Sequence, residues 1–65
     1  MRLWLRNIRL MRRMTEKQVA DAAGIAQPFY HRIENGAAPS VQTAKKISKI
    51  LGFDWTLFFP DEETA

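Results

Sequence analysis

The sequence predicts an all-α fold, a compact bundle of five short helices, and three features of the chain indicate it. Apolar residues recur at spacings of three and four, the period of an amphipathic helix. No stretch alternates apolar and polar residues as a half-exposed strand would. Glycine, proline and capping residues divide the chain into short segments. We expect one domain over residues 1–60 and an acidic, flexible tail at 61–65.

The first two helices are predicted from apolar spacing and from a capping signal. The buried face of the first helix is expected to hold Trp4, Leu5, Ile8 and Met11. A separate stripe about 60° wide contains the arginines of this segment, which are Arg2, Arg6, Arg9 and Arg13. Thr15, followed three positions later by Gln18, predicts a capping box that opens a second helix. That helix runs through Ala23, and Gly24 supplies the left-handed turn after it.

Three further helices follow in the second half of the chain. The third is predicted from Gln27 to Glu34, where Pro28 is tolerated because its missing N–H has no partner in a first turn. Ser40 caps the fourth helix and Gly52 ends it. The buried stripe of this fourth helix is expected to be Val41, Ala44, Ile47 and Leu51. Asp54 caps a last short helix that Pro60 must stop.

Charge and composition narrow the classes of partner. The net charge is +3, and basic residues crowd the first quarter of the chain. A basic end suggests a polyanion partner, although charge alone favours this no more than a solvated surface. The chain has no cysteine and a single histidine, which excludes thiolate and zinc sites, so no metal, cofactor or small-molecule ligand is expected. No window approaches about 18 apolar residues, so no membrane span is expected.

The strongest motif runs from Thr15 to Gly36, where two short helices are joined by a tight glycine turn. Small Ala20 lets the two helices approach closely, and Gly24 makes the turn. The space between the helices is expected to be filled by Val19, Ile25, Tyr30 and Ile33. This layout is that of a helix-turn-helix, whose second helix offers a polar outer face.

Five short motifs are spaced along the chain: Ile8-Arg9, Thr15-x-x-x-Val19-Ala20, Gly24-Ile25, Ile33-Glu34-Asn35-Gly36 and Pro39-Ser40-x-x-Thr43-Ala44. Together they resemble the Cro and lambda-repressor family of XRE-type regulators, from about Leu3 to Phe59. The aromatic ending at 52–59 also resembles short regulators of phages and mobile elements. The resemblance implies a lambda-repressor-like domain, a transcriptional repressor that binds double-stranded DNA in the cytoplasm and is encoded by a bacterium or a phage.

The resemblance places the third helix in the major groove, with the preceding helix on the phosphate backbone. The base-reading residues are then Gln27, Pro28, Phe29, His31 and Arg32. Gln27 matches the main base-contacting position, where an amide pairs with adenine, and Arg32 takes guanine or a phosphate. Phe29 lies at the boundary of this face, so it either packs into the core or meets a thymine methyl. Titration of His31 would make binding sensitive to pH.

The resemblance also implies phosphate contacts from Thr15, Lys17, Gln18, Asn35 and Ser40. Three departures from the family pattern bear on them. Glu16 stands where the family has glutamine, and an anion facing phosphate repels it. The loop that often carries a basic residue is Ala37-Ala38. Ala26 replaces the serine or threonine that normally caps the reading helix.

Two further expectations concern contacts inside and between chains. Arg9 and Glu34 correspond to a family pair that forms an internal salt bridge. One reading helix covers few base pairs, so we expect a homodimer on a palindromic operator, weak without DNA. The expected dimer interface is Trp55, Phe58 and Phe59, and the alternative is that these rings cap the core against Trp4 and Leu51.

The sequence also bears on two other classes of function. Catalysis is not expected, because the chain has one histidine, no cysteine and no phosphate-binding glycine loop. The alternative to a DNA-binding regulator is a protein-interaction module of antitoxin or antirepressor-partner type with the same fold. Salt-dependent binding to duplex DNA distinguishes the two, because phosphate neutralisation gives a steep salt dependence.

Overall fold

The computed structural model describes residues 1–60, which form four α-helices and one short 3-10 helix. In chain order these are α1 (Leu3–Met11), α2 (Glu16–Ala23), α3 (Gln27–Glu34), α4 (Val41–Leu51) and the 3-10 helix η1 (Trp55–Phe58). The all-α prediction is confirmed, but the fifth α-helix is wrong, because the space between Asp54 and Pro60 holds only the tighter 3-10 turn. The predicted tail at 61–65 lies outside the described residues.

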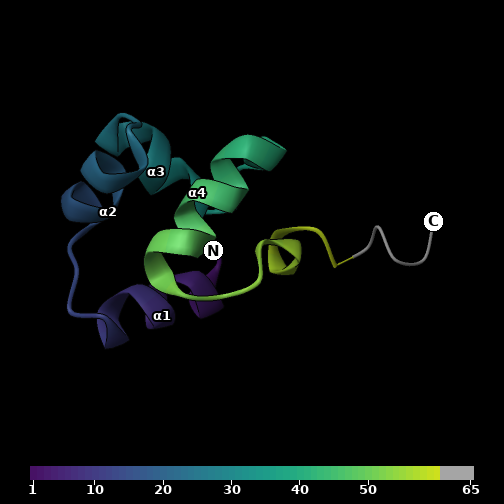
Figure 1. Ribbon diagram of the computed structural model, residues 1–65, viewed down its shortest axis with the longest axis horizontal. Helices are drawn as coiled ribbons and strands as arrows, with labels where there is room; N and C mark the ends of the chain where they lie inside the picture. Colours follow the sequence, from purple (N-terminus) through teal and green to yellow (C-terminus); the bar gives the residue numbers. More distant parts are fainter. Residues whose placement is uncertain (61–65) are drawn as a thin grey trace.

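The helices pack in two groups that α4 joins. Helices α2 and α3 lie against each other at the upper edge of Figure 1, and α1 lies along the lower edge. Helix α4 crosses between these edges and packs against both α2 and η1. The first helix of the chain is therefore separated from most of α3, which it meets near the end of α3.

Side-chain caps set the starts of α2 and α4. Thr15 Oγ1 accepts a hydrogen bond from the Gln18 N–H at 3.0 Å, and Gln18 Oε1 accepts one from the Thr15 N–H at 2.9 Å. This confirms the predicted capping box of α2. Ser40 Oγ accepts from the Thr43 N–H at 3.1 Å at the start of α4. Helix α3 begins without a side-chain cap, because Ala26 has no acceptor to offer.

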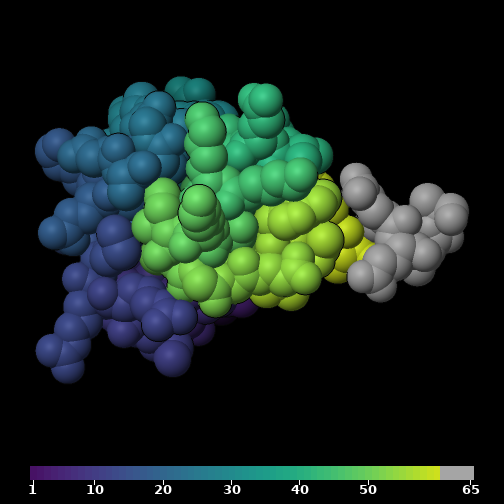
Figure 2. Space-filling model, in the orientation of Figure 1, coloured from purple at the N-terminus to yellow at the C-terminus, as the bar shows by residue number. Residues whose placement is uncertain are grey.

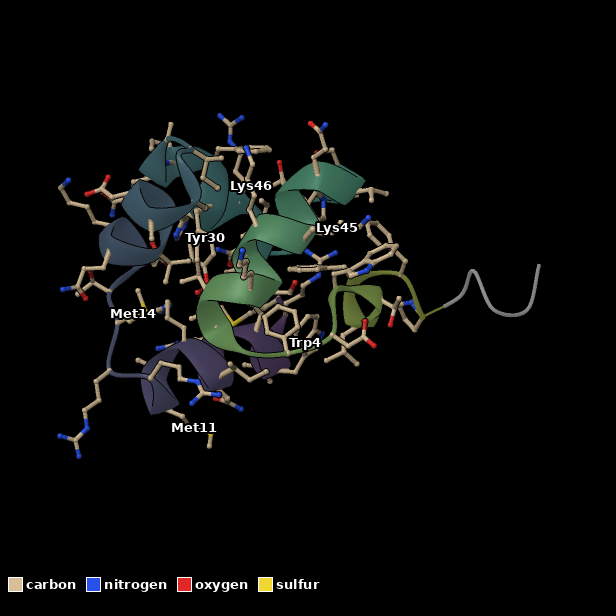
Figure 3. All side chains as sticks on the ribbon, viewed as in Figure 1. Trp4, Met11, Met14, Tyr30, Lys45 and Lys46 are labelled. Carbon is tan, nitrogen blue, oxygen red and sulfur yellow. The ribbon has the colours of Figure 1, made fainter. Side chains whose placement is uncertain are left out.

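One core joins all four α-helices. Its fully buried apolar side chains are Leu5, Val19, Ala20, Tyr30, Ile33, Ala44, Ile47 and Leu51. An aromatic cluster extends this core toward the end of the chain, where Trp4 meets the rings of Phe53 and Phe58 edge-on at centroid distances of 5.3 and 5.2 Å. Figure 3 shows Tyr30 inside the bundle and Trp4 between α1 and η1. The aromatic end therefore belongs in part to the core.

Two residues predicted to be buried are exposed. Met11 is 80% exposed and Val41 is 46% exposed. Met11 is the last residue of α1 and Val41 the first of α4, so each lies at a helix end beyond the core contacts. Figure 3 shows Met11 pointing away from the molecule at its lower edge.

Within residues 1–60, no helix combines the length and the apolar character that crossing a membrane requires.

Candidate nucleic-acid interface

Helix α3 has one buried side and one exposed side. Tyr30, Ile33 and Glu34 are buried against the rest of the molecule. All of the predicted base-reading residues lie on the exposed side: Gln27, Pro28, Phe29, His31 and Arg32. Phe29 is 38% exposed, so it does not pack into the core. The exposed face of α3 thus offers an amide, an imidazole, a guanidinium and an aromatic ring along one short helix.

The start of α2 meets the exposed face of α3 at His31. The Glu16 carboxylate oxygens lie 3.1 and 3.2 Å from His31 Nδ1. On the other side of the ring, Asn35 Nδ2 lies 3.3 Å from His31 Nε2 and also donates to the His31 carbonyl at 2.8 Å. A neutral ring with its proton on Nδ1 satisfies both neighbours, since Nδ1 donates to Glu16 and Nε2 accepts from Asn35. The sequence predicts that Glu16 faces phosphate and repels it. In the structure, the Glu16 carboxylate is instead paired with His31.

Other residues assigned to phosphate already have partners within the protein. Thr15 and Gln18 bond each other in the capping box, and Ser40 Oγ donates to Thr43 Oγ1 at 3.1 Å. Lys17 Nζ lies 2.9 Å from Asp21 Oδ2, and both side chains are about two-thirds exposed. An exposed pair of this kind contributes little stability, so Lys17 can exchange Asp21 for another anion.

The arginines of the first segment do not form one exposed stripe. Arg9 is 8% exposed, and its Nε donates to Glu34 Oε2 at 2.5 Å. This hydrogen bond is the main reason that the pKa of Arg9 is raised, so the guanidinium stays charged. Arg12 Nε donates to the Leu51 carbonyl at 2.8 Å, at the end of α4. Of the predicted arginine stripe, Arg6 and Arg13 are exposed, Arg2 is partly buried, and Arg9 is buried in the expected pair with Glu34.

Tyr30 lies directly beneath the exposed face of α3. Its side chain is fully buried, and its hydroxyl has no hydrogen-bond partner within residues 1–60. Burial, with the nearby Glu34 carboxylate, raises the pKa of Tyr30, so the hydroxyl stays neutral. The Tyr30 ring packs in the core with Val19 of α2 and Ile33 of α3, as the sequence predicts.

The three rings at the aromatic end have different surroundings. Phe58 is 5% exposed and packs against Trp4 in the core, which leaves it too little surface for an interface. Trp55 and Phe59 are half-buried, with ring centroids 6.0 Å apart. Lys45 Nζ of α4 lies 5.1 Å from the centroid of the Trp55 ring. Figure 2 shows the surface of residues 54–60 continuous with that of α4.

Residues 1–60 contain no group of three or more acidic or histidine side chains that could hold a metal ion, and this part of the chain has no pocket.

Comparison with known proteins gives two matches. The sequence model of the helix-turn-helix family matches residues 5–58. The chain is 52% identical over 62 residues to a Bacillus subtilis (strain 168) protein named "Uncharacterized HTH-type transcriptional regulator YqaF". The aligned region covers 94% of this chain and 82% of that relative. No solved structure matches the chain at a significant level.

Proposed function

The chain belongs to the XRE-type helix-turn-helix family of transcriptional regulators, and from this premise we propose that it is a repressor that binds double-stranded DNA with sequence specificity. The observation that carries the proposal is the exposed polar face of α3 beside the start of α2. In a helix-turn-helix, these are the elements that meet the major groove and the phosphate backbone. A protein that occupies an operator can block transcription by its presence there, so repression requires no site on the protein other than the DNA-binding one.

The proposed base contacts come from the exposed side of α3. Gln27 is the first residue of the helix, and its amide can pair bidentately with adenine. Arg32 can bond guanine or a phosphate, and Phe29 is exposed enough to meet a thymine methyl. Pro28 and His31 complete the proposed set, and His31 exchanges its contact with Asn35 for one in the groove. Each of these roles requires that α3 lies in the major groove with its N-terminal turn nearest the base edges.

The proposed phosphate contacts flank α3. Lys17 is the one basic residue of α2, and to contact a phosphate it gives up only its exposed pair with Asp21. Asn35 and the Ser40 end of α4 approach the backbone after α3, where amide groups at a helix start favour anions. Thr15 and Gln18 hold the start of α2 in place through their capping box and contribute by orienting its N–H groups.

We propose that the protein acts as a homodimer on a palindromic operator. Two α3 helices must then lie about 34 Å apart, one turn of DNA. The proposed contact is between Trp55 and Phe59 of the two copies, with Leu57, which is 48% exposed, at its margin. Such a surface is small, so the dimer is weak in solution and forms on DNA. In this proposal the chain is a phage or mobile-element regulator acting in the bacterial cytoplasm.

A second function has one observation in its favour. Glu16 lies at the start of α2 in contact with His31 of α3, and Arg9 is buried in its pair with Glu34, so the proposed DNA side is less basic than the sequence indicates. A protein-interaction module with this fold would need no basic surface.

Selection of bound sequences from a random duplex pool tests the proposal. We expect a palindromic motif with half-sites one turn apart, and affinity that falls steeply with added salt. A chain that enriches no sequence and whose duplex binding does not depend on salt would support the interaction module instead.

A further inference from the structure

Arg2 joins three separate parts of the chain. Its backbone N–H donates to the Glu34 carbonyl at 2.6 Å, and its Nη1 donates to the carbonyls of Ile33 at 2.5 Å and Ala37 at 2.7 Å. The guanidinium also lies 5.3 Å from the centroid of the Phe58 ring in η1. One side chain thus contacts the end of α3, the segment that follows α3 and the aromatic core.

These contacts match the electrostatics at the end of α3. The last carbonyls of a helix have no partner within the helix and carry its negative dipole end. A guanidinium satisfies such carbonyls with charge-assisted hydrogen bonds. Arg2 is partly buried, and this desolvation lowers its pKa, so the contacts replace hydration that the group has lost.

The segment that Arg2 reaches is the one that leads from α3 to α4. Asn35 and Gly36 turn the chain, with Gly36 at φ 116°, a conformation that favours glycine. The Ala37 N–H donates back to the Arg32 carbonyl at 2.9 Å, so Ala37 is held by one backbone bond and by Arg2. The methyl side chains of Ala37 and Ala38 cannot form hydrogen bonds that would fix the segment.

We propose that Arg2 is a positioning residue for segment 35–38, which raises DNA affinity by holding this segment beside α3 without touching DNA. The inference rests on the proposed function, in which this segment meets the phosphate backbone. Holding the segment before binding removes the ordering cost that a mobile segment would incur on the duplex. The contact with Phe58 fixes the guanidinium from its other side, so that its direction is set by the core.

Arg2→Ala and Arg2→Lys are the variants that test this proposal, and Arg6→Ala is the matched control. Arg6 carries the same charge on α1, is exposed, and makes no side-chain hydrogen bond within residues 1–60. Two quantities are measured at a temperature where each variant is folded: hydrogen exchange of the Ala37 amide, and affinity for the selected operator at several salt concentrations.

We expect Arg2→Ala to speed exchange at Ala37 and to weaken operator binding about tenfold, with the salt dependence unchanged. Arg2→Lys keeps the charge but not the forked geometry, so it should recover only part of the affinity. Arg6→Ala should leave exchange at Ala37 as in the wild type.

Three results would overturn the inference. Unchanged exchange at Ala37 in Arg2→Ala would show that Arg2 does not hold the segment, whatever happens to DNA binding. A salt slope reduced by about 0.9 would instead make Arg2 a direct phosphate contact. Faster exchange with unchanged operator affinity would leave Arg2 a purely structural residue. A wild-type chain that binds no duplex would contradict the proposed function, and the exchange result would still decide whether Arg2 orders the segment.

Discussion

Arg9 of α1 and Glu34 at the end of α3 form a buried, two-bond ion pair. Arg9 Nε donates to Glu34 Oε2 at 2.5 Å and Arg9 Nη2 donates to Glu34 Oε1 at 3.3 Å. The two residues are 8% and 3% exposed. Arg9 Nη1 also donates to the Met14 carbonyl at 2.9 Å, so the same side chain fixes the turn before α2. The pair therefore joins the first helix to the proposed reading helix.

Removing Arg9 should be far more costly than removing an exposed lysine. Arg9→Ala leaves the Glu34 carboxylate buried without its partner, and we expect a loss of about 3–5 kcal/mol in the free energy of unfolding. Lys17→Ala breaks the exposed pair with Asp21 and should cost about 1 kcal/mol or less. Urea denaturation of both variants measures the difference.

The double variant Arg9→Met, Glu34→Leu serves as a second check on this ion pair. It replaces both charges by apolar groups and should recover much of the stability lost in Arg9→Ala. If Arg9→Ala and Lys17→Ala proved equally mild, the buried pair would not have the role that its geometry indicates.

Gly52 and Gly24 offer a matched comparison of two helix ends. Both have left-handed backbones, with φ 82° and 70°. A Cβ at Gly52 would lie 2.8 Å from Arg12 Nη2, whereas a Cβ at Gly24 would meet nothing within 4 Å. Gly24→Ala should cost about 1–2 kcal/mol from backbone strain alone. Gly52→Ala should cost about 1 kcal/mol more, because it displaces the hydrogen bond from Arg12 to Leu51.

The Arg12→Ala background isolates this second effect. Without the guanidinium, the two glycine substitutions should become equally costly in thermal or urea unfolding. An excess cost at Gly52 that survives in Arg12→Ala would show that something other than Arg12 opposes the Cβ.

Trp55→Ser should reduce the number of protomers that occupy a palindromic duplex from two to one at low protein concentration. The variant removes a half-buried ring of the proposed interface, and we expect affinity for the full site to fall about tenfold or more. Phe58→Ala is the contrasting variant, because this ring lies in the core and its loss should cost about 3–5 kcal/mol of stability. Sedimentation with the duplex measures stoichiometry. One wild-type protomer saturating the full site would contradict the dimer.

The features that the sequence predicts well are local. The capping box of Thr15 and Gln18 and the cap of Ser40 act within one turn, so their residue types are sufficient to place the starts of α2 and α4. The exposed side of α3 follows from the helical period, since Tyr30 and Ile33 point the other way. Local chemistry also predicts that Gly24 ends α2, because that residue needs a left-handed backbone.

The features that the sequence does not predict depend on contacts between distant residues. Arg2 and Ile33 are 31 positions apart, and Glu16 and His31 are 15 apart, so no periodic pattern relates them. An arginine on a helical wheel has the same position whether it faces solvent or a distant carbonyl. The exposure of Met11 and Val41 has the same origin, because a wheel does not show where neighbouring elements stop covering a helix.

The central claim, that α3 reads DNA bases, is tested most directly by the affinity of Gln27→Ala for the selected operator and for a random duplex of equal length. Gln27 is exposed at the first position of α3 and its replacement removes no core contact, so folding should be unchanged. The account predicts a loss of about 1–3 kcal/mol on the operator, almost none on random DNA, and relaxed preference at one position in each half-site. Equal losses on both duplexes, or no loss on either, would contradict it.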